Sequence, residues 1–154
     1  MTKLNIKDTG IRCKGNVEKN YEQVPHSIFR YLELGLISGN DLAVYLLLLK
    51  NDNKEIGYAF PTTPQLAIWT GLSKRTVITA TTNLELVSLI RVEKVPGFPN
   101  KNRYNVFLPH EKEVLEKLVP QLKAELDQKI MKLGLEAEQD KQRLLGALST
   151  HVRD

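Results

Sequence analysis

Residues 63–77 read TPQLAIWTGLSKRTV, and this stretch decides the fold. Its first two residues form a typical helix start, because threonine caps free backbone N–H groups and proline fits the first helical turn. That helix must be short, since Gly71 follows soon after and tolerates the positive φ of a tight turn. Ser73 can then cap a second helix over residues 74–86. The stretch therefore predicts two helices joined by a turn of about three residues.

The second predicted helix has one apolar face and one polar, basic face. Helical spacing places on the apolar face Val77, Ala80, Thr81 and Leu84. The opposite face carries Lys74, Arg75, Thr79, Thr82 and Asn83. Two helices joined by a short glycine-containing turn, the second with a polar and basic face, are typical of a helix-turn-helix.

The residues after the second helix predict a β-hairpin. Residues 89–95 alternate imperfectly and are typical of a strand, residues 96–102 are rich in turn formers, and residues 103–108 predict a second strand. A hairpin directly after the second helix of such a motif is the wing of a winged helix. Its predicted loop carries Lys101 and Asn102, so the tip could reach a phosphate or a minor groove.

Two further helices are expected before this motif. Pro25 can open the first of them. Its apolar stripe consists of Ile28, Phe29, Leu32 and Leu36. The second, over residues 40–49, is apolar nearly all round after its first turn, so we expect it to be the central buried helix. Tyr45 and Trp69 lie in apolar helical patterns and are expected in the core, and residues 55–60 could be a short strand or an extended connection.

The positive charge is concentrated in the same part of the chain. The 154 residues carry 22 Lys and Arg against 18 Asp and Glu, a net charge of +4. Residues 61–108 alone carry six basic against two acidic side chains, which equals that whole excess. A basic cluster confined to one stretch is the electrostatic footprint expected of a nucleic-acid surface. A solvated region rich in Lys and Arg is the alternative.

Other functional classes find little support in the sequence. Cys13 is the single cysteine, which excludes an internal disulfide framework and a Cys-rich zinc site. His26, His110 and His151 lie in separate segments without a metal-ligand or catalytic partner at useful spacing. No run approaches the ~18 uncharged apolar residues of a membrane span, and the N-terminus lacks the apolar core of a signal peptide. We therefore expect a cytoplasmic protein that is not an enzyme and has no cofactor, no metal and no membrane partner.

The C-terminal part is expected to be helical from residue 111 nearly to its end, with Pro120 starting a new helix or kinking the first. Its apolar stripe consists of Leu115, Leu118, Leu122, Leu126, Ile130, Leu133, Ala137, Leu144 and Leu148. Residues 121–148 would form a helix of ~40 Å, which exceeds what a small domain needs for its own core. We expect a second copy of the chain to bury this apolar stripe by forming a dimer. The alternative is that the helix folds back onto its own domain.

Residues 24–108 resemble the winged helix-turn-helix of many bacterial regulators. The resemblance is carried by residues 63–90, from TPQLA through TGLSKRTV to LELVSLI. In that family, the serine and the Arg-Thr pair at the start of the second helix meet phosphates and bases. The resemblance implies these roles for Ser73, Arg75 and Thr76.

The chain departs from the family pattern at one position, and its upstream part resembles a second group. Ser88 stands where the family usually has the glycine that precedes the wing. Residues 24–29 (VPHSIF) and 38–48 (SGNDLAVYLLL) resemble the opening of DnaD-like and plasmid replication-initiator N-terminal domains. This second resemblance implies a role in DNA replication as an alternative to transcription.

We therefore expect a mainly α protein with a small β-hairpin wing, an α+β fold that ends in a long C-terminal helix. Residues 1–20 would be a flexible N-terminal arm, residues 21–109 the winged helix-turn-helix domain, and residues 110–154 a helical extension for dimerisation. The expected function is sequence-specific binding of double-stranded DNA by a homodimeric regulator of transcription, associated with the nucleoid or a plasmid. The alternative is a plasmid or phage replication or segregation factor. Its winged domain would bind origin or centromere repeats, and its C-terminal helix would recruit a replication or segregation protein.

The helix from Lys74 is expected to enter the major groove, which is wide enough for a helix and carries an unambiguous base code. Lys74 or Arg75 could reach guanine and Asn83 could read adenine, whereas Ser73 and Thr76 are better placed for phosphates. The full expected DNA interface is Ser73, Lys74, Arg75, Thr76, Thr79, Thr82, Asn83, Arg91, Lys94, Lys101, Asn102 and Arg103. The residues expected between two copies of the chain are Leu115, Leu118, Leu122, Leu126, Ile130, Leu133 and Leu144.

Overall fold

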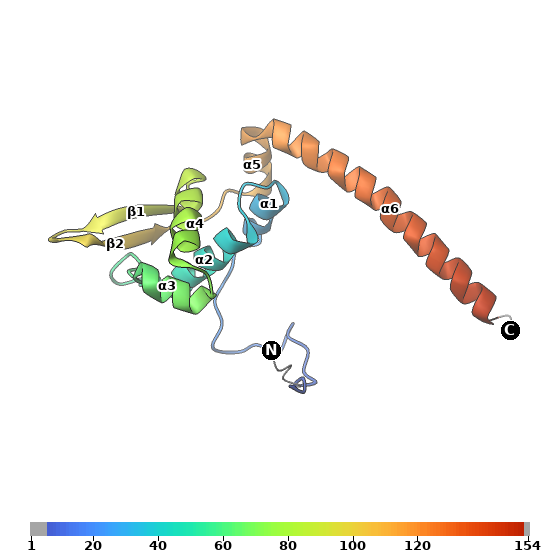
Figure 1. Ribbon diagram of the computed structural model, residues 1–154, viewed down its shortest axis with the longest axis horizontal. Coiled ribbons are helices and arrows are strands. Elements are labelled where there is room, and N and C mark those ends of the chain that lie inside the picture. The colour runs from blue at the N-terminus through green and yellow to red at the C-terminus, as the bar shows by residue number, and fades with distance from the viewer. Residues whose placement is uncertain (1–5, 153–154) are drawn as a thin grey trace.

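The chain folds into a helical domain with a β-hairpin, followed by a long C-terminal helix (Figure 1). The computed structural model describes residues 6–152, and the side chains of residues 6–150. Its elements are α1 (Ile28–Glu33), α2 (Gly39–Lys50), α3 (Thr63–Thr70), α4 (Lys74–Leu86), β1 (Ile90–Val95), β2 (Phe98–Val106), α5 (Lys112–Leu118) and α6 (Pro120–Val152). In Figure 1 the hairpin extends from one side of the helical domain and α6 from the other. This is the predicted mainly α fold with a small wing and a long C-terminal helix.

Helix α2 is the centre of the core, as its nearly all-apolar sequence predicts. Val44 and Tyr45 on this helix are fully buried, and α4 packs against it with Val77 and Leu84, which are buried too. The Tyr45 hydroxyl donates a hydrogen bond of 3.0 Å to the carbonyl of Phe107. Burial raises the pKa of Tyr45 to about 12. This contact ties the end of the hairpin to the central helix.

Helices α2 and α3 each begin one or two residues earlier than predicted. Ser38 caps α2: its hydroxyl accepts from the Asp41 N–H at 3.2 Å, while the Asp41 carboxylate accepts from the Ser38 N–H at 2.9 Å. Thr62 caps α3 in the same reciprocal way with Gln65, at 3.2 and 2.8 Å. Each pair satisfies two free N–H groups and therefore fixes the start of its helix.

Two aromatic side chains lie at the surface and not in the core. Trp69 is 43% exposed, so the prediction that it is a core residue is wrong, and Phe29 of the predicted apolar stripe is 50% exposed. Helix α1 has only six residues, and a stripe that reaches Leu36 cannot form on it. It buries Ile28, as predicted, together with Tyr31.

The turn of the hairpin is tighter than predicted. Strand β2 begins at Phe98 and pairs antiparallel with β1, so most of residues 96–102 are strand and the prediction of a long loop there is wrong. The turn itself is made by Pro96 and Gly97, and Gly97 has the positive φ of 80° that such a turn requires. The wing is therefore a hairpin with a tight turn, and its register shifts between Lys94 and Val95, so that residues 99–101 of β2 have no partner in β1.

The segment before α3 turns at residues 54–57 and then adds one bridge to the hairpin. The N–H of Ala59 donates to the carbonyl of Tyr104 at 2.8 Å, and the N–H of Tyr104 donates back at 2.7 Å. Both residues are buried. Ala59 is thus fixed against β2, whereas residues 55–57 form a turn and not the predicted strand or extended connection.

The end of α4 has the backbone geometry that glycine usually supplies. Ser88 has a φ of 61°. Its N–H donates to the carbonyl of Glu85, and the N–H of Leu89 donates to the carbonyl of Leu84, both at 3.0 Å. This pair of bonds is a Schellman ending, in which the left-handed residue is most often glycine. The chain turns from α4 into β1 as the wing requires, with serine in that position.

The C-terminal helices are joined to the domain at one end only. Helix α5 is held on α1 by a buried ion pair between Arg30 and Glu116. The N–H of His110 also donates to the Tyr31 hydroxyl at 2.9 Å. Helix α6 starts at a proline, as predicted, and every described side chain after Leu126 is exposed. Most of α6 therefore leads away from the domain (Figure 1).

Candidate nucleic-acid interface

Helix α4 presents a polar and basic face to solvent. Its buried side chains are Val77, Ala80 and Leu84. The exposed ones include Lys74, Arg75, Thr79 and Thr82. Because α4 packs against both α2 and α3, this exposed face is held in a fixed orientation on the domain. Sequence reasoning placed these four residues by helical period alone.

The start of α4 is organised by a serine and a threonine. The Ser73 hydroxyl accepts from the Thr76 N–H at 3.1 Å, so Ser73 caps the helix as predicted. The two hydroxyl oxygens lie 2.9 Å apart and share a hydrogen bond. Lys74 and Arg75 are exposed beside this cap. Free N–H groups and two cations at one helix start are a favourable arrangement for an anion such as phosphate.

The two threonines further along α4 are tied to their own helix. The Thr79 hydroxyl donates to the carbonyl of Arg75 at 3.1 Å, and the Thr82 hydroxyl donates to the carbonyl of Ile78 at 2.9 Å. Each hydroxyl oxygen can still accept a hydrogen bond. Each side chain also carries a methyl group, which can contact the methyl of thymine.

Asn83 is turned away from the exposed face of α4. Its amide nitrogen lies 3.4 and 3.5 Å from the two carboxylate oxygens of Asp41, which is buried at the start of α2. Asn83 itself is half-buried. This contact gives the amide a structural partner between two helices, so the geometry does not support the prediction that Asn83 reads a base.

An acidic residue in the wing holds two of the predicted contact residues. The Glu93 carboxylate accepts from Arg103 at 3.0 and 2.8 Å and lies 3.6 Å from the Arg91 guanidinium. The hydrogen bond from Arg103 lowers the pKa of Glu93, and the charges of both arginines act in the same direction. Glu93 therefore neutralises part of the wing's positive charge.

Both of these arginines also lie over aromatic rings. The Arg91 guanidinium is 5.1 Å from the centre of the Phe107 ring, and that of Arg103 is 5.1 Å from the centre of the Tyr58 ring. Such contacts favour one orientation of each guanidinium. Arg91 and Arg103 thus have partners within the chain, whereas sequence reasoning treated them as free.

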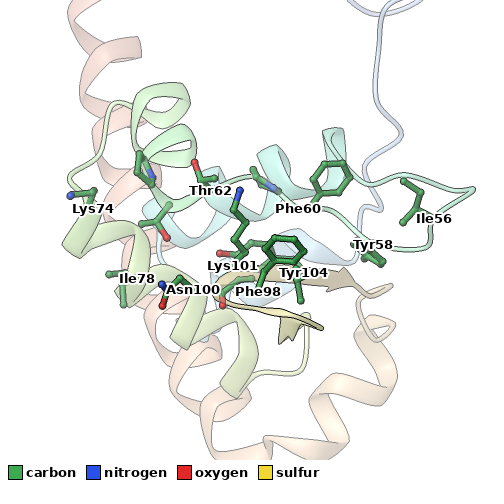
Figure 2. A pocket seen from close by; sticks show the side chains of 15 residues that line it. Ile56, Tyr58, Phe60, Thr62, Lys74, Ile78, Phe98, Asn100, Lys101 and Tyr104 are labelled. Atoms are coloured by element: carbon green, nitrogen blue, oxygen red, sulfur yellow. The ribbon is translucent and has the colours of Figure 1, made fainter.

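The remaining polar residues of the wing lie nearer its tip. The Lys94 amine donates to the side-chain oxygen of Asn102 at 2.9 Å across the hairpin. Lys101 is exposed, and it lines the same cavity as Lys74 of α4 (Figure 2). The helix start and the wing tip therefore border one continuous surface with lysines on both sides.

The residues predicted to lie between two copies of the chain fall into two groups. Leu115 and Leu126 are buried in the core of their own chain, and Leu122 packs against it. Their assignment to a dimer interface is therefore not supported, because the chain itself covers them. The exposed members are Leu118, Ile130, Leu133 and Leu144.

The described part of the chain holds no arrangement for a metal. No group of three or more His, Cys, Asp or Glu side chains that could hold an ion is found among the side chains of residues 6–150. Cys13 is exposed. No helix within residues 6–152 is long and apolar enough to cross a membrane.

Sequence reasoning missed the residues that organise the wing. Glu93 pairs directly with Arg103 in the register of the hairpin, and opposite charges at facing positions of two strands are a signal that was available. Tyr58 gave no such signal, because its ring reaches Arg103 only through the bridge between Ala59 and Tyr104. That pairing links residues far apart in sequence.

A family model described as a helix-turn-helix domain matches residues 34–90. This range contains α2, α3 and α4 and ends where β1 begins. Residues 34–90 are therefore similar to a helix-turn-helix domain, and the β1–β2 wing follows them. We found no match among curated protein sequences.

Among solved structures, the chain is similar to the ST1889 protein from the thermoacidophilic archaeon Sulfolobus tokodaii. The two are 24% identical, the match covers 69% of this chain and 90% of that chain, and the TM-score is 0.39. A mutant of S. aureus MepR bound to an oligodeoxyribonucleotide is 21% identical, with coverage of 79% and 84% and a TM-score of 0.42. A MarR-family transcriptional regulator from Silicibacter pomeroyi is 18% identical, with coverage of 74% and 75% and a TM-score of 0.40. All three TM-scores are below 0.5.

Proposed function

We propose that this chain is a sequence-specific double-stranded DNA-binding protein that regulates transcription as a homodimer. The observation that carries the proposal is the exposed face of α4, which joins Lys74 and Arg75 to the capped start of a helix fixed on the core. A helix with such a face fits the major groove of B-DNA. Its rigid packing would hold the reading side chains in register.

Within this proposal the residues of α4 divide into two roles. Lys74 and Arg75 are long enough to reach guanine O6 and N7, the commonest specific contact in the major groove. Ser73 and Thr76 lie at the helix start, where they and the backbone N–H groups would contact a phosphate. Phosphate contacts set the register, and base contacts set the sequence.

The wing would contact the flanking backbone or minor groove. Lys94 and Lys101 near its tip are exposed and carry the contacts we propose there. Arg91 and Arg103 would contribute less, because Glu93 already pairs with both. With three or four phosphate contacts per protomer, log K should fall with log salt at a slope of about −5 to −7 for a dimer.

The exposed stripe on α6 supports the homodimer. Ile130, Leu133 and Leu144 are each at least half exposed in the single chain. Packing a second copy along α6 would remove this apolar surface from water, which favours association. Two copies would present two α4 helices to successive turns of the same face of DNA.

The same stripe also favours a second candidate function. If α6 binds another protein and not a second copy, the chain would be a plasmid or phage replication or segregation factor. It would then bind repeats at an origin or centromere. In either case we propose that it acts in the cytoplasm, on chromosomal or plasmid DNA.

The test of the proposed function is the affinity for labelled duplex DNA, measured by fluorescence anisotropy. The double variant K74A/R75A should bind about tenfold to a hundredfold more weakly than the unmodified chain, because each of the two lost contacts costs about 1 kcal/mol. The control K112A/K117A removes two lysines of α5 and should bind normally. Equal binding by both double variants, with unchanged circular dichroism, would mean that α4 does not contact DNA.

A further inference from the structure

One large apolar side chain lies on the exposed, basic face of α4. Ile78 is 56% exposed. It lies one helical turn after Lys74 and one turn before Thr82, so the three side chains form one row along the helix. Lys74 and Ile78 both border the space between α4 and the wing (Figure 2). Ile78 therefore stands in the middle of the face proposed to enter the major groove.

The residue types on this face are not explained by helix stability. Residues 76–82 read TVITATT, and six of these seven residues are β-branched. Such residues are weaker helix formers than alanine or lysine, because a helix restricts their χ1 angle. Val77 is buried in the core, but Ile78, Thr79 and Thr82 are exposed. Burial does not account for β-branched residues at these three positions, which points to a role at the surface.

The two threonines beside Ile78 use their hydroxyl donors within the helix. Thr79 donates to the carbonyl of Arg75 at 3.1 Å, and Thr82 donates to the carbonyl of Ile78 at 2.9 Å. What these side chains can still offer to a base is an acceptor oxygen and a methyl group. With Ile78 between them and the helix start, the centre of the exposed face is rich in methyl groups, whereas its start carries the cations.

Thymine is the base whose edge complements such a surface. Its 5-methyl group is an apolar group that a base pair presents in the major groove. A β-branched side chain suits this group, because its stiff χ1 holds its methyl groups in place before contact. One helical turn is about 5.4 Å, or one to two base pairs at about 3.4 Å each. Ile78 would therefore meet a base close to the one that Lys74 meets.

We propose that Ile78, with the methyl groups of Thr79 and Thr82, recognises the 5-methyl group of thymine in the major groove. This inference rests on the proposed function, in which α4 enters that groove. It assigns a thymine to each half-site, one or two base pairs from the guanine contacted by Lys74 or Arg75. Ile78 then determines specificity by an apolar contact and not by a hydrogen bond.

The first test replaces thymine by deoxyuridine, which lacks the methyl group but keeps the same hydrogen-bonding groups. The probe is the duplex that the full chain enriches from a random-sequence library, with one thymine replaced at a time. At one or more thymines in each half-site, replacement should lower the affinity about threefold to fivefold, the effect of one buried methyl group. Selected half-sites without thymine, or full affinity for every deoxyuridine duplex, would overturn the proposal.

The variant Ile78→Ala tests whether this side chain makes the contact. It should bind the thymine duplex about threefold to tenfold more weakly than the unmodified chain, and replacement of the sensitive thymine should then cost less than about twofold more. Ile78→Val keeps the branch at Cβ and should retain most of the sensitivity to deoxyuridine. If Ile78→Ala and the unmodified chain are equally sensitive, Ile78 does not contact the methyl group.

Leu135→Ala is the matched control. Leu135 is an exposed apolar side chain of α6 that lies off the proposed dimer stripe. This variant should bind the thymine and deoxyuridine duplexes as the unmodified chain does. Thermal unfolding checks that both alanine variants are folded. If Leu135→Ala loses as much affinity for the thymine duplex as Ile78→Ala does, the loss is not specific to α4 and the assignment fails.

Methylated cytosine gives an independent test. The sensitive thymine–adenine pair is replaced by cytosine–guanine or by 5-methylcytosine–guanine, which present the same hydrogen-bonding groups and differ only in the methyl group. The unmodified chain should bind the methylated duplex about threefold more tightly than the unmethylated one, whereas Ile78→Ala should bind both equally. Equal binding by the unmodified chain would contradict the proposal.

The same titrations separate this inference from the proposed function. If the chain binds no duplex, or enriches no sequence, the proposed function fails together with the inference. If it binds a selected duplex but is insensitive to deoxyuridine and to methylated cytosine, the inference alone fails. In that case α4 still reads DNA, through the polar groups of Lys74 and Arg75.

Discussion

Ser73 and Ser88 lie at the two ends of α4, and each meets a requirement of the local backbone. Ser73 satisfies a free N–H group at the helix start, and Ser88 adopts the left-handed φ of 61° with which the helix ends. The first role suits serine well. The second does not, because a side chain in the left-handed region costs about 1–2 kcal/mol. The turn into the wing is therefore made at some cost in stability.

The variant Ser88→Gly should be more stable than the unmodified chain. Glycine adopts the left-handed conformation without strain but loses more freedom on folding, so the net gain should be about 0.5–1 kcal/mol. Urea denaturation followed by circular dichroism would measure it. Ser88→Ala is the matched control and should give no gain, since alanine has the same strain. Equal stability of the glycine and alanine variants would contradict the account of this turn.

The sequence predicts which side chains are exposed where the exposure depends on a single helix or strand. Lys74 and Arg75 follow from the helical period of α4, and Ser73 from the preference for capping residues. The orientation of Asn83 cannot be predicted in this way, because its partner Asp41 lies on another helix and is distant in sequence. The contact between Tyr58 and Arg103 cannot be predicted either, since it depends on the bridge between Ala59 and Tyr104 of β2.

At the scale of elements, the wing has less free positive charge than its sequence suggests. Glu93 in β1 faces Arg103 in β2 and also contacts Arg91 on its own strand. All three side chains lie near the surface, where such pairs contribute little to stability. Glu93 therefore matters less for folding than for the charge that the wing offers to DNA.

The variant Glu93→Gln should bind DNA more tightly than the unmodified chain. Loss of the carboxylate frees the charge of Arg91 and Arg103 for phosphates, and each new phosphate contact steepens the salt slope by about 0.9. Anisotropy titrations over a range of salt concentrations would measure the affinity and the slope. Glu136→Gln on α6 removes the same charge far from the wing and should change neither. A Glu93→Gln variant with unchanged affinity and slope would show that the wing arginines do not approach DNA.

The sequence predicts the type and order of the elements better than their ends. Helices α2 and α4 follow from their apolar patterns, and the hairpin follows from its strand and turn residues. The starts of α2 and α3 depend on reciprocal caps at Ser38 and Thr62, which compete with equally plausible neighbouring residues. The turn of the wing was predicted too long, because the sequence does not show that Phe98 pairs with Val95 or that the turn-forming residues after it belong to β2.

At the scale of the whole molecule, the start of α6 packs on the domain and the rest of the helix is exposed. Its first turns pack on the domain through Leu122 and Leu126, and α5 is tied to α1 by the Arg30–Glu116 pair. The rest of α6 leads away with its apolar stripe uncovered (Figure 1). Apolar spacing in the sequence predicts the stripe but not where it leaves the core, since that point depends on how α5 docks.

The double variant Leu133→Asp and Leu144→Asp should be monomeric. Both side chains are at least half exposed in the single chain and lie on the proposed dimer stripe, where two charges could not be buried. Sedimentation velocity of the full chain would measure the oligomeric state. Leu135→Asp lies on the opposite side of the helix by its spacing and should leave the dimer intact. If the unmodified chain is monomeric, the homodimer is contradicted, and the apolar stripe of α6 would be a binding surface for another protein.

The central claim is that two copies of α4 read a specific sequence in DNA. Selection of bound duplexes from a random-sequence library, followed by sequencing, tests this claim most directly. We predict that the unmodified chain enriches an inverted repeat with half-sites about 10 base pairs apart, or a multiple of that spacing, and that K74A/R75A does not. If the unmodified chain enriches no sequence, or K74A/R75A enriches the same one, α4 does not read DNA as we describe.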